Sequence, residues 1–319
     1  MADVSSLHTT RRGWRIALPS ACALFFVSIS GAWSQPLAVT EVAPGVFVHQ
    51  GTIAIFTPQN RGDVANIGFV VGREGVAVID TGGSKRIGEA LREAIRKITD
   101  KPVRYVINTH MHPDHVFGNA AFEADKPIFV GHKKLARGLA ARAERYLAAN
   151  RELLGEEAFA GTRIIGPTLQ VDGSQDIDLG DRVLTLTARP TAHTDNDLTV
   201  LDTKTGTMFL GDLLFAAHVP ALDGSIKGWL ALLDSLKSQQ YARAVPGHGP
   251  ASMPWPDALK PIERYLTTVA DDVRRAIKDG RTLAEATKTA GQSEKQSWEL
   301  FDEFNARNVS SAFHELEWE

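Results

Sequence analysis

The strongest constraint on this chain is the segment 109–115, which reads Thr-His-Met-His-Pro-Asp-His. The apolar run 103–107 before it predicts a strand, and residues 116–122 after it open a predicted helix, so the motif lies on a loop between two elements. Imidazole and carboxylate groups suit zinc, and iron and manganese as well. The spacing His-x-His-x-Asp-His therefore predicts a metal site. The alternative is a polar loop that holds histidines by chance.

Residues 1–34 have the pattern of a secretory signal peptide. The positive charges are Arg11, Arg12 and Arg15. An apolar run over 16–32 follows, and Ala-Trp-Ser at 32–34 is a small-x-small cleavage site. An uncleaved anchor helix is the alternative, but Pro19 and the short apolar run argue against it. We expect an exported, periplasmic protein with no stable membrane span after cleavage. The weak twin-arginine resemblance of residues 10–14 leaves the export route open.

Removal of 34 of the 319 residues would leave a mature chain of 285 residues. The only cysteine, Cys22, lies in the removed segment, so the metal site must use nitrogen and oxygen ligands. Removing three arginines and one aspartate from a net charge of −3 leaves −5, and no basic run follows one face. These features argue against a nucleic-acid partner. We predict a single domain over 35–319 with a helical C-terminal region.

Strands and helices are predicted to follow one another through the rest of the chain. Apolar runs predict strands at 46–49, 75–80, 103–107, 127–130, 182–188, 198–201, 207–210 and 244–245. A hairpin is expected over 52–72, with strands 52–56 and 66–71, and a strand over 171–181 is expected to pair with 182–188. Helices are predicted at 84–98, 134–154, 229–237 and 257–279.

Three more candidate ligands lie at or just beyond predicted strand ends, beside glycine or proline: His193, Asp212 and His248. Sites of layered α/β proteins gather at such ends, and the first motif already requires further ligands. His218 follows Asp212 by six residues and is a candidate for the substrate pocket. The other histidines of the mature chain are interpreted as surface or packing residues; they are His49, His132 and His314.

These motifs together resemble the metallo-β-lactamase superfamily over about residues 42–252, and Asp80-Thr81-Gly82 matches its early strand-end aspartate. The resemblance implies an αββα sandwich: two mixed sheets face to face, helices outside, and a metal site at one edge. It implies two Zn²⁺ ions, for which iron or manganese could substitute. The implied ligands are His110, His112 and His193 for the first ion and Asp114, His115 and His248 for the second, with Asp212 bridging both.

Four segments resemble, more narrowly, the quinoprotein relay system zinc metallohydrolases. They are residues 60–69, 108–119, 193–198 and 211–225. This resemblance implies a periplasmic location and an association with a pyrroloquinoline-quinone-dependent dehydrogenase as partner. It leaves the substrate unstated.

The resemblance implies hydrolysis of a small molecule by a metal-bound hydroxide, with Asp114 as the catalytic residue that orients the nucleophile and takes its proton. The expected substrate is an ester, thioester, lactone or amide, β-lactams included. The loop 193–197 departs from the pattern of glyoxalase-II-like thioesterases. Phe215 stands where many β-lactamases carry a substrate-binding lysine, and Lys227 is interpreted as a surface residue. Residues 60–63 form either a flap over the site or a simple hairpin turn.

The sequence is also compatible with two other classes of function. One is a mononuclear iron oxidoreductase of the same fold, similar to persulfide dioxygenases. The other is a metal-bearing relay protein that serves a quinoprotein dehydrogenase without hydrolysing a substrate.

Overall fold

The computed structural model describes residue 2 and residues 36–319 of the chain. Contacts divide the chain into two units, Met1–Trp33 and Ser34–Glu319, and the second carries the fold. Apart from residue 2, the predicted signal peptide with Cys22 lies outside the described residues. No helix in the described part of the chain is long and apolar enough to span a bilayer.

The first sheet has seven strands in sequence order, and it is mixed. They are β1 (Thr40–Ala43), β2 (Val46–His49), β3 (Ile67–Val71), β4 (Val76–Ile79), β5 (Val103–Ile107), β6 (Ile128–His132) and β7 (Leu169–Val171). The pairs from β1 to β4 are antiparallel, and those from β4 to β7 are parallel. The parallel half therefore places the C-terminal ends of β4 and β5 side by side.

The second sheet has six strands in the order β13-β12-β11-β10-β9-β8. They are β8 (Ser174–Asp178), β9 (Val183–Ala188), β10 (Leu198–Asp202), β11 (Thr207–Phe215), β12 (Arg243–His248) and β13 (Met253–Pro254). Only β11 and β12 run parallel to each other. Their C-terminal ends lie together, as those of β4 and β5 do in the first sheet.

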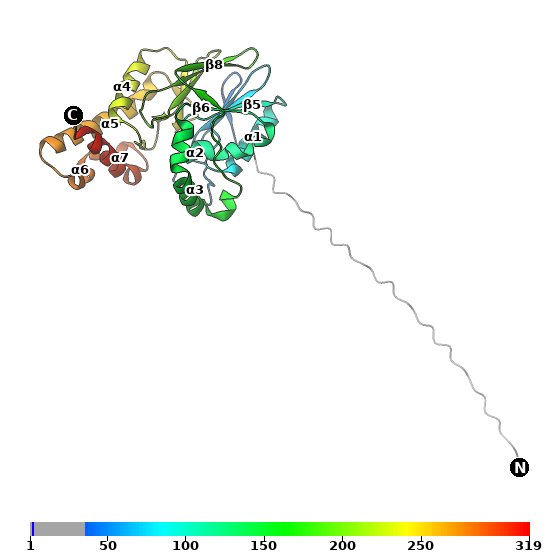
Figure 1. The fold of residues 1–319 in the computed structure, drawn as a ribbon, viewed down its shortest axis with the longest axis horizontal. Coiled ribbons are helices and arrows are strands. Elements are labelled where there is room, and N and C mark those ends of the chain that lie inside the picture. Colours follow the sequence, from blue (N-terminus) through cyan, green and yellow to red (C-terminus); the bar gives the residue numbers. More distant parts are fainter. Residues whose placement is uncertain (1, 3–35) are drawn as a thin grey trace. The chain divides into compact units, whose positions relative to one another are not determined.

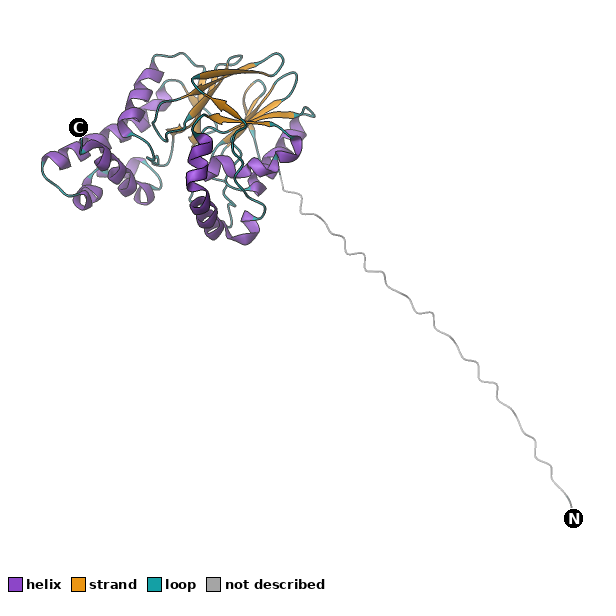
Figure 2. Ribbon diagram, in the orientation of Figure 1, coloured by secondary structure: helices purple, strands orange, loops and turns teal. Residues whose placement is uncertain are grey.

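The described part of the chain contains seven α-helices, with short 3₁₀ turns between some of them. They are α1 (Lys85–Ile98), α2 (Pro113–Val116), α3 (Leu135–Phe159), α4 (Ile226–Lys237), α5 (Lys260–Lys278), α6 (Leu283–Thr289) and α7 (Phe301–Leu316). The 3₁₀ turns are η1 (Phe117–Ala121), η2 (Glu123–Asp125), η3 (Asp257–Leu259) and η4 (Gln292–Ser297). The helices lie outside the two sheets (Figure 1, Figure 2).

Apolar burial explains these layers. Val46 and Ile107 of the first sheet share one core cluster with Val200 and Phe209 of the second, so the two sheets pack face to face. The outer face of the first sheet packs against α1, whose buried aliphatic residues Ile87, Leu91 and Ile95 recur at helical spacing. Burial of each such side chain contributes about 1.5–3 kcal/mol. This arrangement confirms the predicted αββα sandwich of two mixed sheets with outer helices.

A third cluster of buried hydrophobic residues packs the C-terminal helices against the second sheet. Trp229 of α4, Tyr265 of α5 and Val309 of α7 are buried in one cluster with Leu210 of β11. The helical C-terminal region is therefore part of the same folded unit as the sheets. Figure 1 shows α5, α6 and α7, coloured orange to red, beside α4.

Two predicted strands are wrong. Residues 52–56 form no strand, because the Asn60 side chain accepts from Thr57 N and Gly62 N and donates to Ile55 O, which folds the segment as a loop. The predicted strand over 171–181 is broken at Gly173, where φ is +82°. Its two parts belong to different sheets, β7 to the first and β8 to the second.

Candidate metal centre

The C-terminal ends of three strands, β5, β11 and β12, carry most of the site. The loop after β5 bears His110 and His112, and α2 begins directly after His112 with Pro113 in its first turn, a position where the fixed φ of proline favours a helix start. In the second sheet, Asp212 lies near the end of β11 and His248 ends β12. Side chains far apart in sequence therefore converge at one edge of the sandwich.

Four side chains form the first group of candidate ligands: His110, His112, His193 and Asp212. Asp212 Oδ2 lies 3.6 Å from His110 Nε2 and 3.4 Å from His193 Nε2. His193 Nε2 lies 2.9 Å from His112 Nδ1. One ligand atom of each residue lies within 4.8 Å of the others, which is the spacing expected around a single ion.

Three side chains form the second group: Asp114, His115 and His248. Asp114 Oδ2 lies 3.2 Å from His248 Nε2 and 3.7 Å from His115 Nε2. The other oxygen of Asp212, Oδ1, lies 3.0 Å from His115 Nε2 and 3.4 Å from His248 Nε2. Asp212 therefore faces both groups, one carboxylate oxygen to each. The grouping is the one that the family resemblance implies.

The donor chemistry fits two divalent cations. Three buried atoms at the centre make no hydrogen bond to any described residue: His110 Nε2, His115 Nε2 and Asp212 Oδ1. Buried polar atoms are normally paired. A cation in the first group would satisfy His110 Nε2, and one in the second group would satisfy His115 Nε2 and Asp212 Oδ1. Imidazole nitrogen and carboxylate oxygen are the ligands of zinc, and also of iron and manganese. The donor set therefore supports a dinuclear centre and leaves the identity of the metal open.

The electrostatics of the first group favour neutral imidazoles. Burial, and then the neighbouring His115, lower the pKa of His110 well below its ordinary value. Burial also lowers the pKa of His193, to about 3. A neutral imidazole has a free lone pair, which metal binding requires.

The second group holds protons more tightly. Burial alone would lower the pKa of His248, but the carboxylates of Asp212 and Asp114 outweigh burial and raise it to about 9. Burial raises the pKa of Asp212, yet His115 and His248 outweigh it and hold that pKa well below the usual range. Metal binding at this group must therefore release imidazole protons, so its affinity rises with pH.

Each histidine of the two groups uses its second ring nitrogen to contact a fixed oxygen. The contacts are His115 Nδ1 to Asp80 Oδ2 at 2.8 Å, His112 Nε2 to Asp223 Oδ2 at 3.2 Å, His193 Nδ1 to Ala221 O at 2.7 Å, His248 Nδ1 to Val64 O at 2.9 Å and His110 Nδ1 to Thr109 Oγ1 at 3.1 Å. Such contacts fix the orientation of the imidazole rings. Asp80 also accepts hydrogen bonds from the backbone and hydroxyl of Thr109.

Sequence reasoning missed Asp223 and left Asp80 without a role. The sequence indicated Asp80 only as an aspartate at the end of a strand. In the structure, its φ of +56° turns the chain away from β4. Asp223 lies in one of the segments that resemble the quinoprotein relay proteins, which was the one signal for it. Its contact with His112 joins residues 111 positions apart, so no local pattern predicts it.

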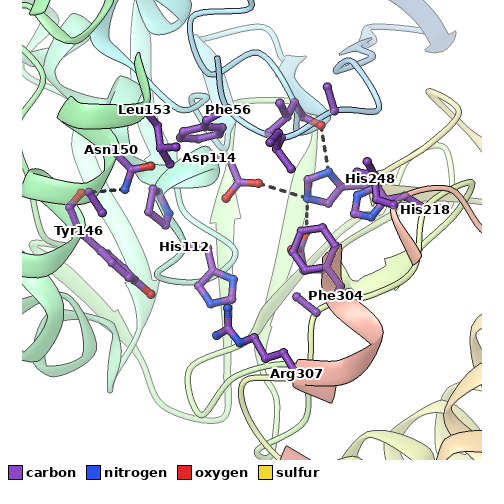
Figure 3. Close-up of a pocket in the computed structure, with 18 of the residues that line it drawn as sticks. Phe56, His112, Asp114, Tyr146, Asn150, Leu153, His218, His248, Phe304 and Arg307 are labelled. Carbon is purple, nitrogen blue, oxygen red and sulfur yellow. Dashed lines mark hydrogen bonds and ion pairs between the residues drawn. The ribbon is translucent and has the colours of Figure 1, made fainter. Parts of the chain in front are cut away.

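A cavity of about 540 Å³ opens over the centre. The residues of the two groups that line it are His112, Asp114, Asp212 and His248. Figure 3 shows Asp114 projecting toward His248, with Phe56 and Leu153 on one side and Phe304 and Arg307 on another. His110, His115 and His193 are fully covered, so only part of the centre faces the cavity.

The remaining predicted site residues take different places. His218 lines the cavity, and its ring centroid lies 4.7 Å from that of His248. Burial lowers the pKa of His218 to about 4, so its ring is neutral. Phe215 stacks on His248 with ring centroids 4.9 Å apart. Lys227 does not line the cavity and lies 3.6 Å from Glu319.

Residues 60–63 form a turn that does not line the cavity, so neither the predicted flap nor a hairpin is present. Residues 54–56 contribute to the wall instead. His49 is buried against Asp63, His132 is buried within β6, and His314 is exposed. None of these three belongs to either ligand group.

Comparisons with known proteins agree with this geometry. Residues 60–248 match the family model of the metallo-beta-lactamase superfamily. A metallo-beta-lactamase from Pontibacter korlensis is 21% identical with a TM-score of 0.59, over 72% of this chain and 99% of that one. The inverting sec-alkylsulfatase Pisa1 from Pseudomonas sp. is 14% identical with a TM-score of 0.66, over 87% of this chain and 50% of that one.

One curated relative shows local sequence similarity. A linear primary-alkylsulfatase from Pseudomonas sp. (strain ATCC 19151) is 36% identical over 62 residues, which are 19% of this chain and 12% of the relative. The chain thus matches only a small part of that relative. The ligand groups, the sandwich and the match over residues 60–248 together show that the chain belongs to the metallo-beta-lactamase superfamily.

Proposed function

We propose that this protein is a zinc-dependent hydrolase that cleaves an ester, thioester, lactone or amide, β-lactams included. The observation that carries the proposal is the placement of Asp212 between the two ligand groups at the base of a cavity. None of the described residues that line this cavity is a serine or a cysteine. The nucleophile is therefore water rather than a side chain.

Two divalent ions held by these groups would supply Lewis-acid polarisation of the scissile carbonyl and lower the pKa of a bound water toward about 7. The chain itself supplies a base at Asp114, which faces the cavity. Burial raises the pKa of this carboxyl, but His115 and His248 outweigh it and lower the pKa to about 2. Asp114 is therefore ionised at neutral pH and can accept the proton of the attacking water.

The local similarity to an alkylsulfatase supports a second candidate, hydrolysis of a sulfate ester. The superfamily fold is common to both reactions, so the substrate decides between them. A panel must therefore contain alkyl sulfates beside carboxylic esters, thioesters, lactones and β-lactams.

The test uses the mature chain, purified and loaded separately with zinc, manganese and iron. We expect about two metal ions per chain, turnover of at least one acyl substrate with zinc, loss of turnover on chelation and its return on adding zinc. No turnover of any acyl substrate at full loading would overturn the proposal. Turnover of alkyl sulfates alone would select the second candidate.

Two other outcomes would support a function other than hydrolysis. Oxygen consumption with a persulfide by the iron-loaded protein would establish the oxidoreductase. Activation of a pyrroloquinoline-quinone-dependent dehydrogenase, without turnover of any substrate, would establish the relay role.

We further propose that the protein acts in the periplasm, in association with such a dehydrogenase. The support is the pattern of residues 1–34 and the resemblance of four segments to quinoprotein relay proteins. Co-purification of the mature chain with a periplasmic dehydrogenase would test the association, and a cytoplasmic location of the processed chain would contradict it.

A further inference from the structure

The cavity over the metal centre has an apolar end. Ile55 and Leu153 line it and are 51% and 48% exposed. The described part of the chain has five exposed large hydrophobic side chains, and two of the five lie at this cavity mouth. Phe56 lies beside them and packs against the apolar cluster beneath α3. Exposed apolar side chains that gather at a cavity favour an apolar ligand.

Two arginines line the cavity and form its cationic end near Asp223: Arg307 of α7 contacts this carboxylate, and Arg145 of α3 lies one helical turn from Arg142, which also contacts it. Arg307 Nη2 lies 3.4 Å from Asp223 Oδ1, and Arg142 lies 3.5 Å from the other oxygen of Asp223. Arg145 forms no ion pair among the described residues; its guanidinium lies 5.8 Å from the ring centroid of Tyr146. Asp223 thus lies beside two guanidinium groups, whereas Arg145 has no carboxylate partner among the described residues. The three arginines therefore leave this end of the cavity positively charged.

Asp114 and His112 of the ligand groups lie between the two ends (Figure 3). Arg145 and Leu153 are eight residues apart on α3, which corresponds to about 12 Å along a helix. Figure 3 shows Phe56 and Leu153 on one side of Asp114 and Arg307 on the opposite side. Asp223 also contacts His112, so the cationic end adjoins the first ligand group.

We propose, on the basis of the proposed hydrolysis, that the substrate is an amphiphile whose scissile bond joins an apolar group to a group that bears an oxyanion. The apolar group binds against Ile55, Phe56 and Leu153, and the oxyanion binds Arg145 and Arg307. In the reaction the water oxygen bonds to the acyl carbon, the acyl–heteroatom bond breaks, and the water proton passes to the leaving heteroatom. A volume of about 540 Å³ accommodates a substrate of this kind.

Matched aryl esters test the two ends separately. The anionic probe is 4-octanoyloxybenzoate, the neutral probe is 4-octanoyloxybenzamide, and 4-octanoyloxybenzenesulfonate distinguishes a preference for sulfonate from one for carboxylate. An acetyl series replaces the octanoyl group. We expect kcat/KM to be about 10- to 100-fold higher for the anionic than for the neutral octanoyl ester, because charge-assisted hydrogen bonds are the strong ones.

Substitutions assign the preference to residues. In the double variant R145Q/R307Q, the ratio of anionic to neutral kcat/KM should fall toward one. Arg137→Gln removes the same charge from α3 outside this cavity and should keep the ratio. Arg142→Gln shares the partner Asp223 and should also keep it; a fall in this variant would mean that the effect passes through Asp223 and would contradict direct binding.

The apolar end has its own variant. Leu153→Ser changes an exposed side chain, so the fold should persist, and it should lower the octanoyl-to-acetyl ratio of kcat/KM about tenfold or more. Ile128→Ser in β6, at a residue that is 43% exposed and does not line the cavity, is the control. An unchanged ratio in Leu153→Ser would contradict the apolar site.

Binding separates this inference from the proposed hydrolysis. The ether analogues 4-octyloxybenzoate and 4-octyloxybenzamide cannot be hydrolysed, and calorimetry measures their affinities. Preference for the benzoate that R145Q/R307Q abolishes would support the inference even if no ester turned over. Equal affinities, together with equal turnover of charged and neutral esters, would overturn it and leave the hydrolase intact.

Discussion

Asp114 combines three properties that few carboxylates share. It belongs to the second ligand group, it lines the cavity, and its pKa is lowered to about 2 by His115 and His248 against the effect of burial. A carboxylate of this kind can act as ligand and as base. Its two roles can be separated only if metal content and rate are measured together.

We expect Asp114→Asn to lower kcat by about 10²–10⁴, the usual effect of losing a positioned proton acceptor. The amide has nearly the same shape, so the fold should persist. Steady-state rates are compared at equal metal loading, measured by mass spectrometry. His218→Ala changes the cavity wall instead and should alter KM or substrate preference at unchanged metal content. Native kcat in fully loaded Asp114→Asn would exclude the proton role.

His115→Ala should bind about one metal ion per chain instead of two. His110, His112, His193 and Asp212 remain as one complete group, which suffices for a tetrahedral ion. Metal content after dialysis is the measurement, and His132→Ala is the matched control, because His132 is buried but belongs to neither group. If the native protein never holds more than one equivalent, the centre is mononuclear.

At the scale of elements, the site depends on the close approach of β11 and β12. These strands run parallel, and Gly247 of β12 lies beside Asp212 of β11. A Cβ atom at Gly247 would lie 2.0 Å from Asp212 Oδ1, which real Cβ atoms do not permit. The Asp212 carboxylate can therefore lie between the two ligand groups only because Gly247 on the neighbouring strand has no side chain.

Gly247→Ala should consequently lower the metal content of the protein although no ligand is changed. The added methyl group must displace Asp212 or separate the two strands. Gly166→Ala is the control, because a Cβ there meets nothing within 4 Å. Metal content and far-ultraviolet circular dichroism are measured together. Full metal loading of a folded Gly247→Ala variant would show that Asp212 needs no such space.

A buried ion pair joins the two sheets. Arg182 donates to both oxygens of Asp202 and to the carbonyls of Pro44 and Val71, so it connects β10 to the edge of the first sheet. Both side chains are almost fully buried. Burial raises the pKa of Asp202, but hydrogen bonds from Arg182 and Thr205 outweigh it and hold the pKa below its usual value.

Arg182→Met should destabilise the fold by about 3–5 kcal/mol at pH 7, because it leaves a buried carboxylate uncompensated. Since the folded pKa of Asp202 is lowered, the pair stabilises the fold above the unfolded pKa of about 3.9 and loses this effect as pH falls through the folded value. Urea unfolding at pH 7 and pH 3 should therefore show a smaller deficit in acid. Lys204→Gln, at an exposed pair with Asp181, is the control; a constant deficit at both pH values would contradict this role.

At the scale of the whole molecule, the C-terminal helices complete the site as well as the core. Val309 of α7 is buried in the same cluster as Trp229, while Phe304 and Arg307 of the same helix line the cavity. The match to the family model ends at residue 248, so this wall lies beyond the matched region. The cavity is thus lined partly by the shared sandwich and partly by a helix outside the match.

The whole chain is also expected to be exported and shortened. We predict that the mature protein begins near Gln35, because a positive region, an apolar run and a small-x-small site precede it. N-terminal sequencing of periplasmic material is the measurement. An N-terminus at Met1 in that material would contradict cleavage. A variant with Ala32→Arg should block processing, whereas Gln35→Ala should not.

The candidate ligands and the fold class could be predicted from the sequence alone. Most of the candidate ligands lie at or shortly after the C-terminal ends of apolar strands, where side chains of a suitable type can converge at one edge of the sheets. Local spacing therefore predicted His110 to His115, and the family resemblance supplied the sandwich and the assignment of ligands to two ions. The prediction of a strand over 52–56 is wrong because the side chain of Asn60 hydrogen-bonds the backbone of its own loop. The predicted export remains a prediction.

The surroundings of the candidate ligands could not be predicted without the three-dimensional structure. Asp223 contacts His112 across 111 residues of chain, and the cavity takes its walls from residues 54–56, α3 and α7. The sequence predicted a helix over 134–154, and nothing local distinguished Arg145 from the arginines of this helix that do not line the cavity. The face that a helix presents to a site depends on how its apolar residues pack against distant elements. The substrate preference that we propose therefore depends on long-range packing, whereas four of the seven candidate ligands, His110, His112, Asp114 and His115, lie in one short stretch of sequence.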